Sequence, residues 1–174
     1  MAAYALYARA GEGDEPARAL VGGRLRALAF ALAGVVLALL AAGTIVTGTG
    51  PHAGDADARR FGFDLEQVAR LHGGIAWATV ALTVTLLIGL HRAGAPRPVR
   101  RHALDLFLLE LAQGAIGYTQ YALDLPALLV GPHILGSALV WLATLRVVFA
   151  TRSRGPLRTA AERRPPAREA PQPV

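Results

Sequence analysis

The sequence predicts an all-α integral membrane protein, a four-helix transmembrane bundle made of two helical hairpins and followed by a disordered cytoplasmic C-terminal tail. Of the 174 residues, 53% are hydrophobic and 17% are charged, which is unlike an ordinary soluble domain. Segments of the chain stay apolar over roughly the 20 residues that a helix needs to cross a bilayer. The arginines gather in the tails and in one loop beside these segments, as is typical of membrane helices.

The first 23 residues are predicted to be the remnant of a preceding helix followed by a cytoplasmic linker. Residues 1–9 are apolar but too short to cross a bilayer, and they lack the basic start of a signal peptide. A short amphipathic or disordered leader is the alternative for this stretch. Residues 10–19 form a polar run that contains Glu12, Asp14, Glu15 and Pro16, which indicates a linker.

The membrane domain is predicted at residues 24–150, with spans at about 25–47, 71–90, 103–121 and 128–149. Asp64 is placed to cap the second helix and Gln67 lies at its third position, so we expect this helix to begin before its span. Residues 151–174 are rich in Arg, Pro and Ala and cannot bury enough surface to fold. They are therefore predicted to form a disordered basic tail.

Charge in the connecting segments predicts the orientation of the helices. The basic segments contain Arg18, Arg24 and Arg26 before the first span, Arg92, Arg97, Arg100 and Arg101 between the second and third, and Arg146, Arg152, Arg154 and Arg158 around the end of the fourth. The other two connections carry the acidic residues Asp55, Asp57, Asp64, Glu66 and Asp124. By the positive-inside rule, both termini and the middle loop are cytoplasmic.

Composition also bears on source and partners. Every basic residue other than histidine is Arg, and Ala, Gly and Pro are abundant, which favours a GC-rich bacterial source and a bacterial cell membrane. The chain has a net charge of +6, and the arginines that carry it lie beside apolar segments. Membrane lipid is therefore the expected partner, and nucleic acid is not. The chain contains no Cys, which excludes disulfides and the thioether attachment of c-type haem.

Two histidines near the outer ends of predicted spans, His72 and His133, are the main candidates for ligand binding. A histidine inside lipid normally faces the bundle interior or a cofactor. Haem iron accepts two axial imidazoles from facing helices at equal depth, and these two residues satisfy that requirement. Small residues nearby leave room for a flat macrocycle or for close helix contact; they are Gly73, Gly74, Gly114, Gly117, Gly136 and Ser137. The alternative is that each histidine hydrogen-bonds a helix or a lipid headgroup.

Polar residues of the third span follow one helix face and should face the bundle interior. Glu110, Gln113, Gly117 and Gln120 have this spacing. Glu110 is interpreted either as a proton or packing residue or as a protonated acid with an internal hydrogen bond. Gln120 is better placed to orient the histidines or the propionates of a haem.

The outward connections contain further candidates. Arg70 is placed, like Gln120, to orient the histidines or the propionates. Arg59 or Arg60 is a candidate to pair with a propionate, although an ordinary solvated loop explains them equally well. His52 is a weak candidate for a metal ligand because no second ligand accompanies it. His91 and His102 belong to the basic loop, where an interfacial position is expected.

A weak internal repeat relates the two halves of the membrane domain. Residues 40–45 (LAAGTI) are similar to residues 111–116 (LAQGAI), and each segment is followed by a helix with a histidine near its outer end. The repeat favours two hairpins packed as a pseudo-symmetric pair, and chance similarity of small apolar residues is the alternative.

Several motifs together resemble one protein family. They are residues 43–55 (GTIVTGTGPHAGD), residues 70–72 (RLH), residues 110–118 (ELAQGAIGY) and residues 131–133 (GPH). In these motifs the chain resembles the C-terminal half of bacterial haem A synthase, especially the actinobacterial type, over about residues 24–146.

The resemblance implies a fold and a function. The family has eight membrane helices in two similar halves and oxidises haem O to haem A for cytochrome oxidase assembly. It implies haem b on His72 and His133, which makes these the metal ligands for its iron. It further implies that residues 1–9 end a fourth helix of the other half. The chain would then be a fragment or a separately encoded half, with the N-terminal half or another membrane subunit as partner.

The chain departs from the family's catalytic pattern. The other half of the synthase carries a glutamate in the motif E-x-x-H-R, whereas here Ala69 precedes His72 by three residues and Gly73 follows it. Glu66 lies on another face of the helix. We therefore assign no catalytic residue to this chain. A free-standing membrane b-type cytochrome that exchanges electrons with quinone, or a non-catalytic assembly module, is the alternative function.

Overall fold

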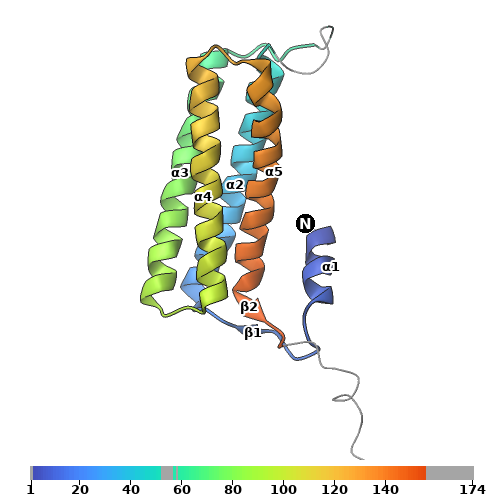
Figure 1. Ribbon diagram of the computed structural model, residues 1–174, viewed down its shortest axis with the longest axis vertical. Coiled ribbons are helices and arrows are strands. Elements are labelled where there is room, and N and C mark those ends of the chain that lie inside the picture. Colours follow the sequence, from blue (N-terminus) through green and yellow to red (C-terminus); the bar gives the residue numbers. More distant parts are fainter. Residues whose placement is uncertain (1, 52–56, 58, 156–174) are drawn as a thin grey trace, which may run out of the picture.

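The computed structural model describes residues 2–51, 57 and 59–155, and within them four long helices pack side by side (Figure 1). These helices are α2 (Gly23–Thr49), α3 (Leu65–Arg92), α4 (Arg97–Ala122) and α5 (Ala127–Ala150). Helices α2 and α3 form one hairpin and α4 and α5 the other. Helix α3 also packs on α4, and α2 on α5, so that α3 and α5 lie across the bundle from each other. The predicted arrangement of two helical hairpins is confirmed.

Three of the described helices, α2, α3 and α5, are long and apolar enough to cross a membrane, which indicates a multi-pass membrane protein. Helix α4 contains the predicted span 103–121 and is 26 residues long, but it does not share this apolar character. Its sequence includes Arg100, Arg101, Asp105 and Glu110. The prediction of four apolar spans is thus confirmed for three of them.

The helix boundaries follow local sequence signals. The Asp64 carboxylate accepts a 2.8 Å hydrogen bond from the backbone N–H of Gln67, which confirms the predicted cap of α3. Pro96 and Pro126 precede α4 and α5, where their missing N–H groups cost no helical hydrogen bond. Asp124 and Leu125 join α4 to α5 with φ angles of 55° and 60°. Both residues therefore adopt left-handed backbone conformations, which are uncommon for residues other than glycine.

The apolar core lies in one half of the bundle. Leu32 and Val36 on α2 pack with Leu86 on α3, Leu106 on α4 and Val147 on α5. The core residues of these helices come from the first half of α2 and α4 and from the last half of α3 and α5. Close packing is therefore concentrated toward the end that contains the α3–α4 loop.

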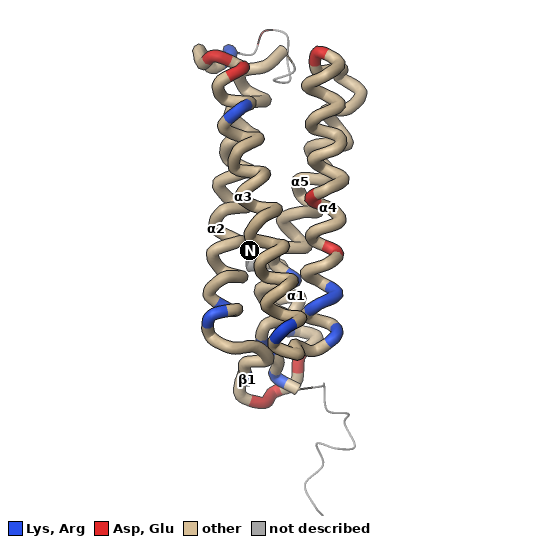
Figure 2. The backbone as a smooth tube through the Cα atoms, turned by 90° about the vertical axis from the view of Figure 1, so that its left-hand side faces the viewer, with Lys and Arg blue, Asp and Glu red and all other residues tan. Residues whose placement is uncertain are grey.

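Arginines mark the same end of the bundle, which we call the basic end (Figure 2). The described arginines other than Arg59, Arg60 and Arg70 belong to α1, to the strands, to the segment directly after β2 or to the helix termini on this side. The opposite end contains the α2–α3 and α4–α5 connections, and we call it the histidine end because His72 and His133 lie near it.

A short helix and two short strands lie at the basic end. Helix α1 (Ala2–Ala10) packs on α5, with the rings of Tyr4 and Phe149 centred 5.5 Å apart. Strand β1 (Arg18–Ala19) pairs in antiparallel register with β2 (Arg152–Ser153). Residues 10–23 were predicted as a linker and residue 151 as the start of a disordered tail, so the pairing of these two segments was not anticipated. Residues 156–174 of that tail lie outside the described residues.

Replacing Asp64 tests the cap of α3. Asp64→Ala should destabilise the fold by about 1 kcal/mol, because the N–H of Gln67 loses its acceptor. Asp64→Asn retains a side-chain oxygen and should stay close to the parent. Thermal unfolding in detergent, followed by circular dichroism, measures both variants, and equal midpoints for Asp64→Ala and the parent would contradict the cap.

Candidate cofactor site at the histidine end

His72 and His133 meet inside the bundle. Their rings are centred 6.5 Å apart, with an angle of 75° between the ring planes. His72 belongs to α3 and His133 to α5, and these two helices lie across the bundle from each other. The side chains therefore reach toward the bundle axis from opposite sides, at the matching depth that the sequence predicts.

Each histidine ring lies against a glycine of a neighbouring helix. A Cβ atom built on Gly43 of α2 would lie 3.1 Å from Cε1 of His72, and one built on Gly117 of α4 would lie 3.4 Å from Cε1 of His133. The rings thus occupy space that a larger residue at either position would fill. Helices α2 and α4 supply the room, and α3 and α5 supply the imidazoles.

The glycine contacts refine the internal repeat. The sequence alignment pairs Gly43 with Gly114, whereas the structure gives the ring-facing role to Gly117, one helical turn further along. Gly117 was among the small residues predicted to line the site and Gly43 was not. Gly43 is part of the internal repeat, so the sequence did draw attention to it. Which side chain it contacts depends on how α2 and α3 pack, which the repeat does not show.

Both imidazoles have a nitrogen without a partner. Nδ1 of His72 and Nδ1 of His133 are buried and lack a hydrogen-bond partner within the described part of the chain. The two side chains as a whole are half-buried. A buried polar atom without a partner costs free energy, and Nδ1 of each ring carries this cost.

The spacing of the rings suits one metal ion between them. Imidazole nitrogens bind such ions at about 2 Å, so two rings on opposite sides of one ion are centred about 6 Å apart. The rings of His72 and His133 are centred 6.5 Å apart. However, the described residues contain no group of three or more His, Cys, Asp or Glu side chains that could hold a metal ion. Within the described residues the pair could supply at most two protein ligands to an ion.

The polar stripe of α4 faces inward, as predicted. Glu110 is 7% exposed, and one of its carboxylate oxygens accepts a 2.8 Å hydrogen bond from the Thr83 hydroxyl of α3. Its other oxygen is buried without a described partner. A Cβ atom at Gly136 of α5 would overlap the Gln113 amide, so this glutamine also points between helices. Gln120 is buried as well.

Two contacts between α3 and α4 were not predicted. Thr83 is the partner of Glu110, and the indole N–H of Trp77 donates a 2.8 Å hydrogen bond to the Tyr118 hydroxyl. Thr83 and Thr79 lie one turn apart on the same buried face of α3. Their spacing was the only feature of the sequence that pointed to a polar face on this helix.

The predicted accessory residues lie at the histidine end, and two of them, Arg60 and Arg70, have other partners. Arg70 pairs with Glu66 on an exposed face of α3, and Arg60 donates to the carbonyl oxygen of Pro51 at 3.1 Å. Arg59 is exposed. A role for these arginines beside a propionate stays a prediction, as does the orienting role of Gln120.

The remaining histidines lie elsewhere. His91 contacts Arg100 and His102 lies 3.9 Å from Asp105, both at the basic end. His52 lies outside the described residues.

No family model, curated protein or solved structure matches this chain. What the chain binds is therefore inferred from the histidine pair and the residues around it.

Two glycine substitutions test the space around His72. Gly114→Ala should stabilise the fold by about 0.5–1 kcal/mol, because alanine favours a helix and nothing lies within 4 Å of the added Cβ. Gly43→Ala should lack this gain, because its Cβ presses on the His72 ring. Thermal unfolding in detergent measures the difference.

A double variant isolates the ring contact. Gly43→Ala combined with His72→Ala should recover the gain relative to His72→Ala alone, since the obstructing ring is gone. Equal stabilisation by Gly43→Ala and Gly114→Ala in the parent background would contradict the contact.

Proposed function

We propose that this chain holds a b-type haem between its two hairpins, with His72 and His133 as the axial ligands of the iron. We further propose that it is the haem b-binding half of haem A synthase and supports the oxidation of haem O to haem A for cytochrome oxidase assembly. The observation that carries the haem proposal is the pair of imidazole rings centred 6.5 Å apart on opposite helices, each with a buried, unpartnered Nδ1.

Haem fits the site better than a bare metal ion does. A structural zinc ion takes four protein ligands, whereas haem iron receives four nitrogens from its own macrocycle and needs only axial ligands from the protein. The described residues supply a pair of imidazoles and no larger cluster of ligands. Facing side chains on the helices of a bundle are also a usual way to hold a cofactor.

The packing near the pair supports the same proposal. The apolar core ends before the histidines, and one glycine lies beside each ring. The two cavities described in the structure lie toward the basic end, so a macrocycle at the histidine end requires the surrounding side chains to move apart. Glycine at positions 43 and 117 lets this movement occur without a clash from those two helices.

The residues around the haem would have separate tasks. One nitrogen of each imidazole would bind the iron, and the other would donate its N–H to a second group that fixes the ring. Arg59, Arg60, Arg70 and Gln120 are the candidates at this end for contacts with propionates. When bound, haem supplies one-electron transfer at a potential that the axial ligands help to set.

The charge distribution supports a membrane orientation. Figure 2 shows the basic residues concentrated toward one end of the bundle. By the positive-inside rule that end would be cytoplasmic, with both termini on this side and the histidine end facing outward. Helix α4 would then be the fourth span, with Glu110 and Gln120 shielded from lipid by the neighbouring helices. The location would be a bacterial cell membrane.

The oxidation itself would belong to a partner. The position three residues before His72 is Ala69, so the carboxylate of the family's catalytic motif has no counterpart here. The synthase proposal therefore needs the N-terminal half or another membrane subunit, with haem O as the substrate of the assembled enzyme.

A free-standing b-type cytochrome that exchanges electrons with quinone is the second candidate. It is favoured by the fact that both proposed axial ligands lie in this one chain.

Histidine substitutions test haem binding directly. His72→Ala or His133→Ala should lower retained haem by at least about tenfold, because each removes an axial ligand. His91→Ala and His102→Ala are matched controls at the basic end and should retain parental haem. The measurement is haem content and the oxidised and reduced absorption spectra of the chain purified in detergent. An unchanged haem content in both His72→Ala and His133→Ala would contradict the two-histidine site. Absence of a Soret band in the parent would favour the non-catalytic assembly module.

Co-expression separates the two candidate functions. With an N-terminal synthase half and a source of haem O, the parent chain should yield haem A and His72→Ala should yield much less. Extraction and chromatography of the haems provide the measurement. If the parent retains haem b but no haem A forms, the synthase proposal fails while haem binding stands. Oxidation of the reduced chain by a quinone would then support the free-standing cytochrome.

A further inference from the structure

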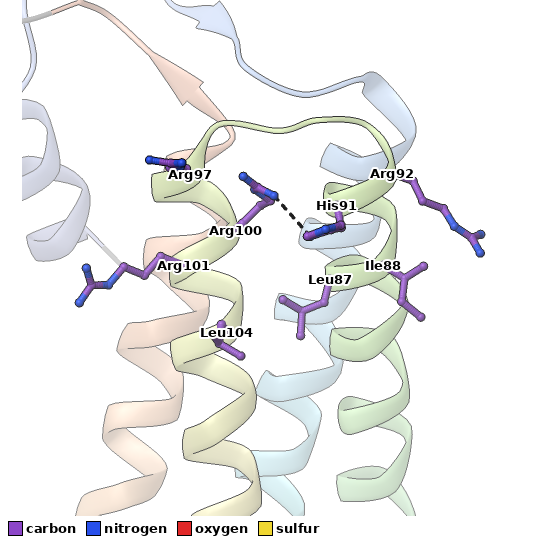
Figure 3. Close-up of a pocket in the computed structure, with 8 residues that line it drawn as sticks. All are labelled: Leu87, Ile88, His91, Arg92, Arg97, Arg100, Arg101 and Leu104. Atoms are coloured by element: carbon purple, nitrogen blue, oxygen red, sulfur yellow. Dashed lines mark hydrogen bonds between the residues drawn. The ribbon is translucent and has the colours of Figure 1, made fainter.

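A shallow, largely open cavity of about 780 Å³ lies between α3 and α4 at the basic end (Figure 3). Leu87 and Ile88 of α3 and Leu104 of α4 form its apolar lining. Its basic lining consists of His91 and Arg92 at the end of α3 and Arg97, Arg100 and Arg101 at the start of α4. In Figure 3 the apolar side chains lie farther from the α3–α4 loop than Arg97 and Arg100 do. The cavity therefore combines an apolar part with a basic rim.

The positive charge of the rim is not balanced by acidic residues. The lining contains no Asp or Glu, and the described ion pairs involve other arginines. Arg100 leans across the cavity and contacts Nδ1 of His91 at 3.3 Å, while its own Nε is buried without a described partner. An anion in the cavity would supply the negative charge that the lining lacks and could pair with the guanidinium groups of the rim.

The N-terminus of α4 adds further positive charge to this end of the cavity. A helix N-terminus has a partial positive charge and favours acidic residues, yet the first turn of α4 contains none. Arg97, Arg100 and Arg101 lie there instead, and Pro96 gives no side-chain cap to the first backbone N–H groups. These groups and the arginines together present only donors and positive charge at one end of the cavity.

The position of the cavity identifies the kind of anion. Leu87, Ile88 and Arg92 end α3, one of the three helices able to cross a membrane. The change from apolar to basic lining therefore lies where a span meets the lipid headgroups. A soluble phosphate would use only the rim, whereas a phospholipid also covers Leu87, Ile88 and Leu104 with its acyl chains.

We propose that this cavity is a binding site for an anionic phospholipid, with its phosphates at the arginines and its acyl chains along the apolar lining. A lipid with two phosphates, diphosphatidylglycerol, is the preferred occupant because both helices contribute arginines, Arg92 from α3 and Arg97, Arg100 and Arg101 from α4. This site lies at the opposite end of the bundle from His72 and His133, and it does not depend on haem.

Two double variants of equal charge test the site. Arg100→Gln/Arg101→Gln removes two guanidinium groups from the rim, and Arg24→Gln/Arg26→Gln removes two from α2 at the same end of the molecule. Binding is measured by native mass spectrometry of the detergent-purified full chain titrated with diphosphatidylglycerol, phosphatidylglycerol or phosphatidylcholine. The rim variant should bind diphosphatidylglycerol about tenfold more weakly than the parent, and the α2 variant should stay within about twofold.

Control variants and competing ligands distinguish a specific lipid site from other causes of weaker binding. Arg100→Lys/Arg101→Lys keeps the charge and should retain most of the binding, and thermal unfolding checks that each variant is folded. Equal loss in the rim and α2 variants, or no loss in either, would overturn the site in favour of diffuse attraction. Displacement of the lipid by millimolar inorganic phosphate would overturn it in favour of a free-anion site. Equal binding of phosphatidylglycerol would remove the preference for two phosphates.

Discussion

Hydrocarbon offers no water to a polar side chain, and this constraint accounts for where the polar residues of the long helices lie. Glu110 meets Thr83, and Trp77 meets Tyr118, each across the contact between α3 and α4. His72 and His133 meet on the axis between α3 and α5. Each of these contacts joins two helices. Thr83 and Glu110 are buried, so their hydrogen bond favours the rotation of α3 and α4 that points these two residues inward.

Large apolar residues and the histidine pair occupy different halves of the bundle. Large apolar residues such as Leu32, Leu86 and Leu106 fill the half toward the basic end, where dense packing holds the helices together. Toward the histidine end, Gly43 and Gly117 replace bulky side chains beside the rings. The packed half can thus set the positions of α3 and α5, while the half with the histidines has smaller residues on α2 and α4.

Features set by neighbouring residues could be predicted from the sequence. The helical spans, the Asp64 cap, the inward stripe of Glu110 and Gln120, and the matched depth of the histidines all follow from local spacing. Gly43 beside His72, Thr83 beside Glu110 and the pairing of β1 with β2 could not be predicted. Each of these joins segments that are distant in sequence, and their register depends on tertiary packing.

The pairing of β1 with β2 has a consequence for how the domain connects to other polypeptide. Arg18 and Ala19 precede the bundle, Arg152 and Ser153 follow it, and their backbones are hydrogen-bonded to each other. The chain therefore enters and leaves the four-helix unit at one point. A unit with adjacent ends can be duplicated in tandem, or inserted within another protein, without stretching a connection across its length. The strand pair thus holds the two connections of the bundle side by side.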